Sequence, residues 1–316
     1  MVDLKDVSVG VEIETINATR HTVAQAIQSV VGGEVVHVGT PSCYDPYRIT
    51  DRNNRIWTVV ADSSLTNAPA HLRAEIVSPI LKYDDIPELQ DVVRAVRKCG
   101  AKTDERTGIH VHISHPDITP KALANLAKMI YKQQDIIYAA LGVSQHRMER
   151  YCKPVDPEFI KRITNNPPSS FRQLNTKWYG HYVEHPQRYD SSRYSILNLN
   201  GYFLRGAVEL RAYSGSLHAG KVRAALIFSM ALLARAMNAN GTSAKKRQYD
   251  PASGKYDMRV FMISALKLNG DTYKNVRSHL LENLSGDSAW KNGRPVSKSK
   301  SKNLATETTE VCCGTN

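Results

Sequence analysis

The chain of 316 residues is poor in cysteine, and its cysteines lack the spacing of a disulfide or metal motif. There are five, an odd number, and no two form a Cys-x-x-Cys pair. This pattern argues against a disulfide framework and against a structural zinc site. It indicates a reducing compartment, so we expect a cytoplasmic protein. The five are Cys43, Cys99, Cys152, Cys312 and Cys313.

Long apolar stretches are missing as well. The longest candidate, Ala224–Ala234, falls short of the about 18 residues that a membrane-spanning helix needs, so we expect no membrane partner. The charged start, Met1–Asp6, lacks the basic, apolar and small-residue order of a secretory signal. A Gly-x-x-x-x-Gly-Lys-Ser/Thr phosphate loop does not occur either.

What remains is an ordinary globular composition with an excess of positive charge. Hydrophobic residues make up 41% and charged residues 23%, which excludes a collagen, a coiled-coil rod and a fully disordered chain. Lysine and arginine number 42 against 30 acidic residues, a formal net charge of +12. This balance favours an anionic partner, which could be a nucleotide, a nucleic acid or an acidic polymer.

Residue periodicity predicts an α+β fold with a mainly antiparallel sheet, because the strand patterns cluster on both sides of a central helical block. We expect one domain over residues 1–290. Its sheet comes from 7–115 and 191–215, its helical insertion from about 119–190, and its helical C-terminal part from 216–285. The basic segment 286–316 loses its apolar residues and is expected to be a disordered tail. Strands are predicted at 7–14, 34–38, 56–61, 73–77, 108–114, 193–199 and 207–213, with a polar loop over 40–55 and helical spacing over 119–151.

Four of these strands carry ionisable groups at alternate positions, so each has one apolar face and one charged face. Such alternation is also typical of a half-exposed antiparallel sheet whose polar face meets only water. Glutamate, however, is depleted in strands, and two glutamates on one face repel. The pairs and triplets that share a face are Glu12 with Glu14, His110 with His112 and Ser114, Glu209 with Arg211, and Arg73 with Glu75.

If these faces line one hollow, four carboxylates meet there. At a few ångströms each like-charge pair would cost about 4 kcal/mol at an effective dielectric constant near 20. Divalent cations would offset this repulsion. A donor set of mostly oxygens with one imidazole favours Mg²⁺ or Mn²⁺ over zinc.

Six short motifs, in this order along the chain, resemble the amidoligase family of the glutamine synthetase/glutamate–cysteine ligase (carboxylate–amine ligase) superfamily. The resemblance covers residues from about 8 to 238. The motifs are Gly10-Val-Glu12-Ile-Glu14, Asp62-Ser-Ser-Leu65, Glu75-Ile-Val-Ser-Pro79, Gly108-Ile-His110-Val-His112-Ile-Ser114, Arg193-Tyr194-Ser-Ile-Leu197-Asn198 and Val208-Glu209-Leu-Arg211.

The resemblance implies a fold and a reaction. The fold is a curved antiparallel sheet of the glutamine synthetase catalytic-domain type, packed by helices. The reaction is ATP-dependent: a phosphate passes from ATP to a carboxylate, and an amine attacks the acyl phosphate to give an amide or isopeptide bond. The cofactors would be ATP and Mg²⁺ or Mn²⁺. The partners would be an amine donor and a carboxylate substrate, either an amino acid, a peptide or a protein tail.

Residue roles follow from the same resemblance. One metal would be bound by Glu12, His110 and Glu209, and a second by Glu14 and Glu75. The nucleotide or substrate would contact Arg211, Arg193 and Asn198, and His112 would either contact a phosphate or orient a metal ligand. Asp62 would position the amine or a metal-bound water. Arg211, Arg193 and Asp62 are the predicted catalytic residues.

Two other functions stay open on the sequence. His110 and His112 with nearby carboxylates could activate water in a metal-dependent hydrolase. The net charge and the Tyr/Arg-rich segment 178–194 could instead serve a non-catalytic nucleic-acid-binding protein, an alternative that the acidic strand faces do not favour.

Overall fold

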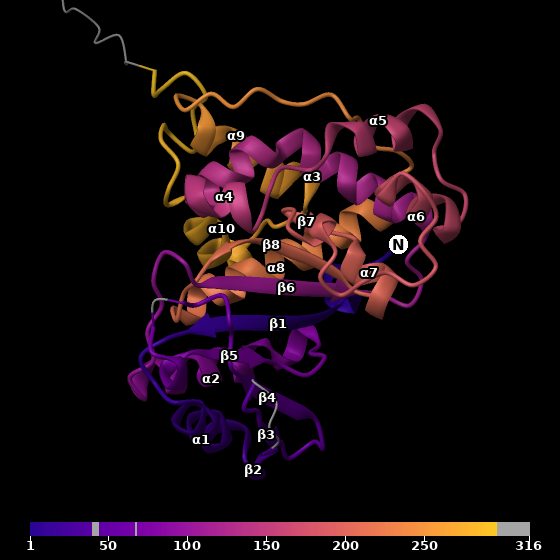
Figure 1. The fold of residues 1–316 in the computed structure, drawn as a ribbon. Coiled ribbons are helices and arrows are strands. Elements are labelled where there is room, and N and C mark those ends of the chain that lie inside the picture. The colour runs from indigo at the N-terminus through magenta and orange to yellow at the C-terminus, as the bar shows by residue number, and fades with distance from the viewer. Residues whose placement is uncertain (40–43, 67, 296–316) are drawn as a thin grey trace, which may run out of the picture.

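The computed structural model describes residues 1–39, 44–66 and 68–295, and at its centre lies one open antiparallel sheet (Figure 1). The described residues form eight strands in the order β2-β3-β4-β5-β1-β6-β8-β7. Strands and helices are interspersed along the chain, which confirms the α+β class. The strands are β1 (Ser8–Thr15), β2 (Glu34–His37), β3 (Tyr47–Thr50), β4 (Ile56–Val60), β5 (Ala74–Val77), β6 (Gly108–Ser114), β7 (Leu197–Asn198) and β8 (Val208–Ser214).

The described residues also form ten α-helices, several of which begin at a side-chain cap. Thr19, Thr119 and Ser144 each accept a hydrogen bond from a backbone N–H in the first helical turn. The helices are α1 (Arg20–Val31), α2 (Ile86–Lys98), α3 (Pro120–Leu141), α4 (Gln145–Arg150), α5 (Pro157–Asn165), α6 (Phe171–Tyr179), α7 (Asn200–Arg205), α8 (Ala219–Asn238), α9 (Gly254–Val260) and α10 (Lys274–Leu281).

One face of the sheet is apolar and is covered by helices. Val9, Val11 and Ile13 of β1 are buried on that face, and α8 packs against both β1 and β6. Helix α8 is apolar on nearly all sides because it also contacts α2, α3 and α10. Burying each such branched side chain contributes about 1.5–3 kcal/mol, so this packing fixes the direction in which the alternate residues point.

The helical segment after β6 is joined to the sheet by one buried arginine. Arg147 of α4 is 2% exposed and donates through Nη1 to the carbonyls of Arg106 and Thr107, at 3.0 and 3.1 Å. Its Nη2 donates more weakly to the carbonyls of Arg211 and Tyr213. Arg147 thus holds the start of β6 beside the middle of β8.

Several predicted elements differ from the observed ones. The segment 40–55, predicted as a loop, contains β3, because Ile49 is buried in a short run of polar neighbours that hid the alternation. Of the predicted strand 193–199, only Leu197–Asn198 forms a strand, because a 3₁₀ turn precedes it and α7 begins directly after it. The helical spacing over 119–151 is interrupted at Gly142, whose φ of 59° ends α3.

The C-terminal part is helical as predicted and contains α8, α9 and α10. Helix α9 passes into a π-helical stretch at Phe261–Ala265. Residues 286–295 form neither helix nor strand, and the rest of the predicted tail, 296–316, lies outside the described residues. Of the helices that the structure describes, none has the length and apolarity needed to cross a membrane. The division into one domain and a tail stays a prediction.

We expect Arg147→Met to destabilise the fold by at least about 3 kcal/mol, because four buried carbonyls would each lose a charged donor. The matched control is Arg150→Met on the exposed side of the same helix, which should change stability by less than about 0.5 kcal/mol. Urea unfolding followed by circular dichroism measures both. Equal midpoints for the two variants would contradict the structural role of Arg147.

Candidate active site and metal centre

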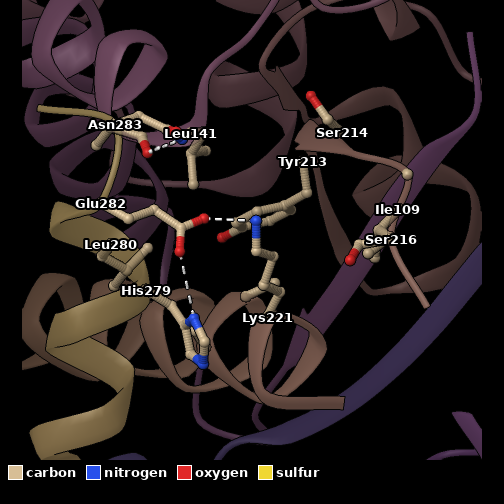
Figure 2. Close-up of a pocket in the computed structure, with 14 residues that line it drawn as sticks. Ile109, Leu141, Tyr213, Ser214, Ser216, Lys221, His279, Leu280, Glu282 and Asn283 are labelled. Atoms are coloured by element: carbon tan, nitrogen blue, oxygen red, sulfur yellow. Dashed lines mark hydrogen bonds and ion pairs between the residues drawn. The ribbon is translucent and has the colours of Figure 1, made fainter. Parts of the chain in front are cut away.

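The apolar side of the sheet has a cavity whose charged groups form ion pairs with one another (Figure 2). It measures about 130 Å³ and lies between α8, α10 and the adjoining ends of β6 and β8. Glu282 pairs there with Lys221 at 2.5 Å and with His279 at 3.5 Å. No group of three metal ligands is found in it within the described part of the chain. The candidate site therefore lies on the other face.

Strand register brings the charged residues of the polar face together. Glu12 of β1 lies opposite His110 of β6, and Glu14 lies opposite Glu75 of β5. On the next strand pair, His112 lies opposite Glu209 of β8. Side chains of directly paired residues are close neighbours on the sheet. The alternation that the sequence predicts thus places these groups on one continuous surface.

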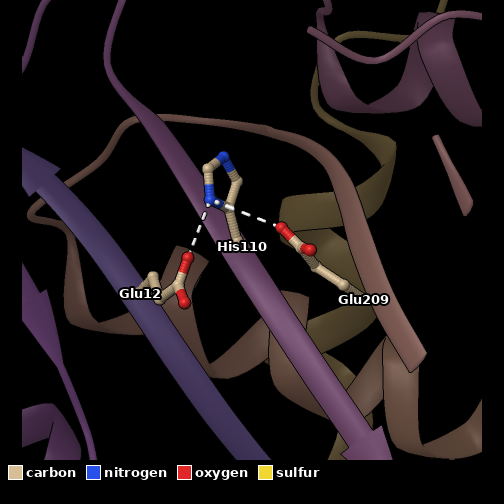
Figure 3. A group of neighbouring side chains, drawn as sticks. All are labelled: Glu12, His110 and Glu209. Carbon is tan, nitrogen blue, oxygen red and sulfur yellow. Dashed lines mark hydrogen bonds and ion pairs between the residues drawn. The ribbon is translucent and has the colours of Figure 1, made fainter. Parts of the chain in front are cut away.

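Glu12, His110 and Glu209 form the first group of candidate metal ligands (Figure 3). The Nδ1 atom of His110 lies 3.1 Å from Glu12 Oε2 and 3.6 Å from Glu209 Oε1. One ligand atom from each residue lies within 4.8 Å of the others. This is the first of the two predicted ligand sets, and the structure brings all its members together.

Glu14, Glu75 and His110 form the second group, with ligand atoms again within 4.8 Å of one another. His110 Nε2 lies 3.5 Å from Glu14 Oε1, so this imidazole stands between the two groups. The N–H of Gly108 donates to Glu14 Oε2 at 2.6 Å and fixes that carboxylate. The sequence predicted Glu14 and Glu75 as a pair, and the structure adds His110 to them.

Mutual repulsion affects the carboxyl groups at the Glu75 end of the site. Burial raises the pKa of Glu75 well above its usual value, and the charges of Glu12, Asp62 and Glu14 raise it further. Burial and the charge of Asp62 also raise the pKa of Glu14, although His110 partly opposes this. These two carboxyls therefore lack sufficient positive charge from the protein itself.

At the other end of the site, cationic neighbours lower the carboxyl pKa values by more than burial raises them. Burial alone would raise the pKa of Glu12, but His110 and His112 hold it well below its usual value. Burial likewise opposes ionisation of Glu209, yet the guanidinium of Arg211 lowers the pKa of that carboxyl. Both groups are therefore held ionised, the state in which a carboxylate binds a metal.

Two neighbours orient Glu209. Arg211 Nη1 donates to Glu209 Oε1, and Asn198 Nδ2 donates to Glu209 Oε2 at 2.6 Å. Asn198 is 2% exposed and its own oxygen accepts the N–H of Gly201. Its amide is thus engaged with Glu209, and its predicted contact with a nucleotide or substrate stays a prediction.

Arg211 shares a strand face with Glu209, and a bulge in β8 begins at Arg211. Val111 pairs with Leu210, whereas Ile109 pairs with Tyr213, so two β8 residues stand opposite His110. Bulges of this kind redirect side chains at functional sites. Arg211 Nε also donates to the carbonyl of Tyr151 at 3.2 Å, which fixes the guanidinium plane.

His112 is the second imidazole beside Glu12. Its buried Nε2 lies 3.1 Å from Glu12 Oε1. Burial lowers the pKa of His112, but hydrogen bonding to Glu12 and the charge of that carboxylate outweigh this and raise it. The pair in turn favours the ionised form of Glu12.

The residues present fit bound divalent cations. Carboxylate oxygens dominate both ligand groups, one imidazole is shared between them, and burial together with neighbouring negative charge raises the pKa of Glu14 and Glu75. Oxygen-rich donor sets of this kind suit Mg²⁺ or Mn²⁺.

A cavity of about 170 Å³ opens over the Glu14 end of the cluster. Asp62, which follows β4, lines it and accepts the N–H of Ser64 at 2.7 Å, so it both forms a turn and faces the site. Arg193 lines it as well, with its guanidinium over the rings of Tyr189 and Tyr194. Tyr189 also hydrogen-bonds Tyr44 at 2.9 Å, which connects two distant loops beside the cavity.

A second cavity of about 360 Å³ lies on the other side of Glu12. Its walls are largely apolar and include Ile80, which is 72% exposed. Besides Glu12, its polar residues are Ser78, His112, Ser114 and Arg205. Glu12 lines both cavities, so the metal-ligand cluster lies between them.

Sequence reasoning missed two guanidiniums and the bulge. Arg106 and Arg147 line the cavity of about 170 Å³ but come from a loop and a helix whose sequences carry no periodic signal toward the site. Arg188, which lines the same cavity, belongs to the Tyr/Arg-rich segment 178–194 that the sequence had singled out. Arg73, expected beside Glu75, instead turns to the loop carbonyl of Ala68 at 2.7 Å.

The geometry describes an α+β protein with an acid-rich, imidazole-bridged centre on an antiparallel sheet. Residues 5–233 match the family described as "Putative amidoligase enzyme", and the chain belongs to that family. The resemblance seen in the motifs is thereby confirmed at the family level, and the membership supports an amide-bond-forming ligase. No curated protein matches the chain.

We expect Glu75→Gln to stabilise the metal-free protein above neutral pH. A carboxyl with a raised pKa in the folded state contributes stability that is lost as pH rises through that pKa. The variant should therefore be more stable than the unchanged protein at pH 8 in EDTA, and this gain should shrink as the pH falls.

Urea unfolding from pH 5 to pH 8 measures this effect, with Glu184→Gln on the exposed surface as the matched control. Added Mn²⁺ should stabilise the unchanged protein more than the Glu75 variant. A variant that is less stable than the unchanged protein across the whole pH range in EDTA would contradict the repulsion between Glu75 and the neighbouring carboxylates.

Proposed function

We propose that this protein is an ATP-dependent carboxylate–amine ligase built on a sheet of the glutamine synthetase catalytic-domain type. The observation that carries the proposal is the pair of ligand groups that share His110 across strands β5, β1, β6 and β8. Membership of the amidoligase family supplies the reaction class. The acid-rich donor set speaks against a zinc hydrolase, and no specific observation favours a nucleic-acid-binding role.

Glu12, His110 and Glu209 would hold one divalent cation, and Glu14 with Glu75 a second. Bound there, the cations would neutralise phosphate charge and offset the repulsion among the carboxylates. The protein's own part is to keep the ligands in place. The backbone of Gly108 fixes Glu14, and Asn198 with Arg211 fixes Glu209.

The two cavities suit two different reactants. The apolar walls of the larger one, near Ile80, fit a purine base, and His112 and Arg205 lie where phosphates would pass toward Glu12. The smaller cavity, with Arg193, Asp62 and several tyrosines, fits a carboxylate substrate and an amine. The phosphate donor and the carboxylate would then meet at the cluster.

The reaction would have two steps. A carboxylate oxygen attacks the terminal phosphorus of ATP, the bond to ADP breaks, and an acyl phosphate forms. The amine nitrogen then attacks the acyl carbon, phosphate leaves and a proton is lost from nitrogen. Arg211 would stabilise the charge on the transferring phosphate, Arg193 a phosphate or the substrate carboxylate, and Asp62 would position the amine.

We expect the protein with Mg²⁺ or Mn²⁺ to bind ATP, and ADP to form only when a suitable acid and amine are both present. Calorimetry measures binding, and a coupled assay measures ADP over a panel of amino acids and short peptides. Hydroxylamine as the amine would trap an acyl phosphate as a hydroxamate. The double variant Glu12→Gln with Glu209→Gln should lose ATP binding, because one whole ligand group is removed. ATP binding that survives in the double variant would refute the proposal.

Arg211→Gln should lower kcat by roughly 10²–10³-fold at saturating Mn²⁺, because the guanidinium acts on the phosphate. Mn²⁺ affinity should also fall, because Arg211 orients Glu209 and keeps it ionised. Arg211→Lys should recover part of the rate, since it retains the charge but not the fork. Thermal unfolding of both variants serves as the control for folding. An unchanged kcat in a folded Arg211→Gln protein would show that Arg211 has no part in catalysis.

A further inference from the structure

A further cavity of about 180 Å³ lies apart from the candidate active site, between α5, α6 and the segment 191–195 that leads into β7 (Figure 1). We call it the aromatic pocket, because Phe159, Trp178 and Tyr194 line it. Of the described residues in its lining, only Tyr194 also lines the smaller cavity, and none is a candidate metal ligand. A ligand bound there would therefore touch the wall of the smaller cavity without entering it.

The apolar walls of the aromatic pocket are held by packing. Phe159 of α5 and Trp178 of α6 are both buried, and their ring centres lie 4.9 Å apart in an edge-to-face arrangement. Trp178 Nε1 donates to Ser192 Oγ at 2.9 Å, which fixes the indole. An apolar cavity of about 150 Å³ is large enough to hold benzene. The volume and walls of the aromatic pocket therefore suit one aromatic ring.

One buried hydroxyl of this pocket lacks a partner. Ser195 lines the pocket and is 8% exposed, and its Oγ has no hydrogen-bond partner in the described part of the chain. The backbone around it is fixed, because the N–H of Lys153 donates to the carbonyl of Tyr194 at 2.9 Å. The N–H of Ile196 donates in turn to the carbonyl of Lys153 at 2.8 Å. A buried polar group without a partner is costly, so Ser195 indicates a ligand that hydrogen-bonds to it.

Lys153 adds unpaired positive charge next to Ser195. The two residues are neighbours in a parallel bridge, and Lys153 is exposed, with no ion-pair partner within the described ranges. The acidic residue of the pocket is already engaged. Asp156 caps α5 by accepting two backbone N–H groups, and it pairs with Arg162 at 3.3 Å. An ammonium and a hydroxyl from bridged neighbours can both donate to one carboxylate.

We propose that the aromatic pocket is a second binding site, separate from the candidate active site, and that it takes an aromatic carboxylate. The ring would lie against Phe159 and Trp178, and the carboxylate would accept hydrogen bonds from Lys153 and Ser195. Two sources offer this chemistry: a free aromatic acid, or the aromatic residue at the carboxyl end of a peptide. The inference goes beyond the proposed function and does not rest on it, since the pocket needs neither ATP nor a metal.

Ligand-observed NMR titration in metal-free buffer without ATP tests the site, with phenylacetate as the probe. Phenylacetate should bind the unchanged protein about tenfold more tightly or better than phenylacetamide, which lacks the charge, and than acetate, which lacks the ring. Lys153→Gln should remove the difference between acid and amide, and Ser195→Ala should weaken binding of the acid about tenfold. Lys161→Gln, at an exposed position of α5, is the matched control and should leave the binding unchanged.

Two further arms locate the site and identify the source of its ligand. Arg106→Gln alters the lining of the smaller cavity and not that of the aromatic pocket, so it should leave the affinity for phenylacetate unchanged. Acetyl-alanyl-phenylalanine presents the same ring and carboxylate at the end of a peptide. Tighter binding of this peptide than of phenylacetate would support the site with a peptide end as the source, and weaker binding would support it with the free acid as the source.

Several results would overturn the inference. Equal affinities for phenylacetate and phenylacetamide, or no binding of phenylacetate, would show that the pocket does not select an aromatic acid. Loss of binding in Arg106→Gln would place the acid in the smaller cavity. An undiminished acid preference in Lys153→Gln, or an undiminished affinity in Ser195→Ala, would remove the proposed carboxylate contacts. Circular dichroism checks that each variant is folded.

Discussion

Repulsion among carboxylates on one face of a sheet is the constraint that organises this structure. Glu12, Glu14, Glu75 and Glu209 are held within one cluster by the hydrogen-bonded backbones of four strands. The protein offsets part of this repulsion with two imidazoles and Arg211, which lower the pKa of Glu12 and Glu209. It leaves Glu75 and Glu14 with raised pKa values, so the uncompensated negative charge is concentrated at the end that faces the smaller cavity.

Such a cluster needs a rigid support, and the apolar face of the same sheet provides it. Side chains alternate along a strand. The residues of β1 that pack toward α8 therefore fix the direction of their sequence neighbours, which lie on the opposite face of the sheet. Arg147 adds a second restraint by joining α4 to the carbonyls of β8 and of the residues that lead into β6. The charged face is therefore held in place from behind and from one edge, and its candidate ligands would need little reorganisation to bind a cation.

How far the sequence predicts this arrangement depends on the range of the interaction. Alternation within a strand is local, so the shared faces of Glu12 with Glu14 and of His110 with His112 could be predicted directly. Strand order is not local. Only the family resemblance predicted that residues of β5, β1, β6 and β8 meet at one site. The bulge opposite His110 and the bonds from Asn198 to Glu209 depend on register, which no single strand encodes. The significance of Ser195 could not be predicted, because it lies in a missing partner, a property of packing alone.

The position of Glu12 connects the chemistry to the shape of the site. This carboxylate lines both cavities, and its two oxygens contact different imidazoles, His110 toward one side and His112 toward the other. On the proposed function, a phosphate that leaves the nucleotide must pass this residue to reach the acid. The two reactants can then approach from separate cavities without competing for one entrance. On the same proposal, Arg193 lies on the acid's side, whereas His112 and Arg205 lie on the nucleotide's side. Binding of the acid and binding of the nucleotide would thus fall to different walls that meet at one carboxylate.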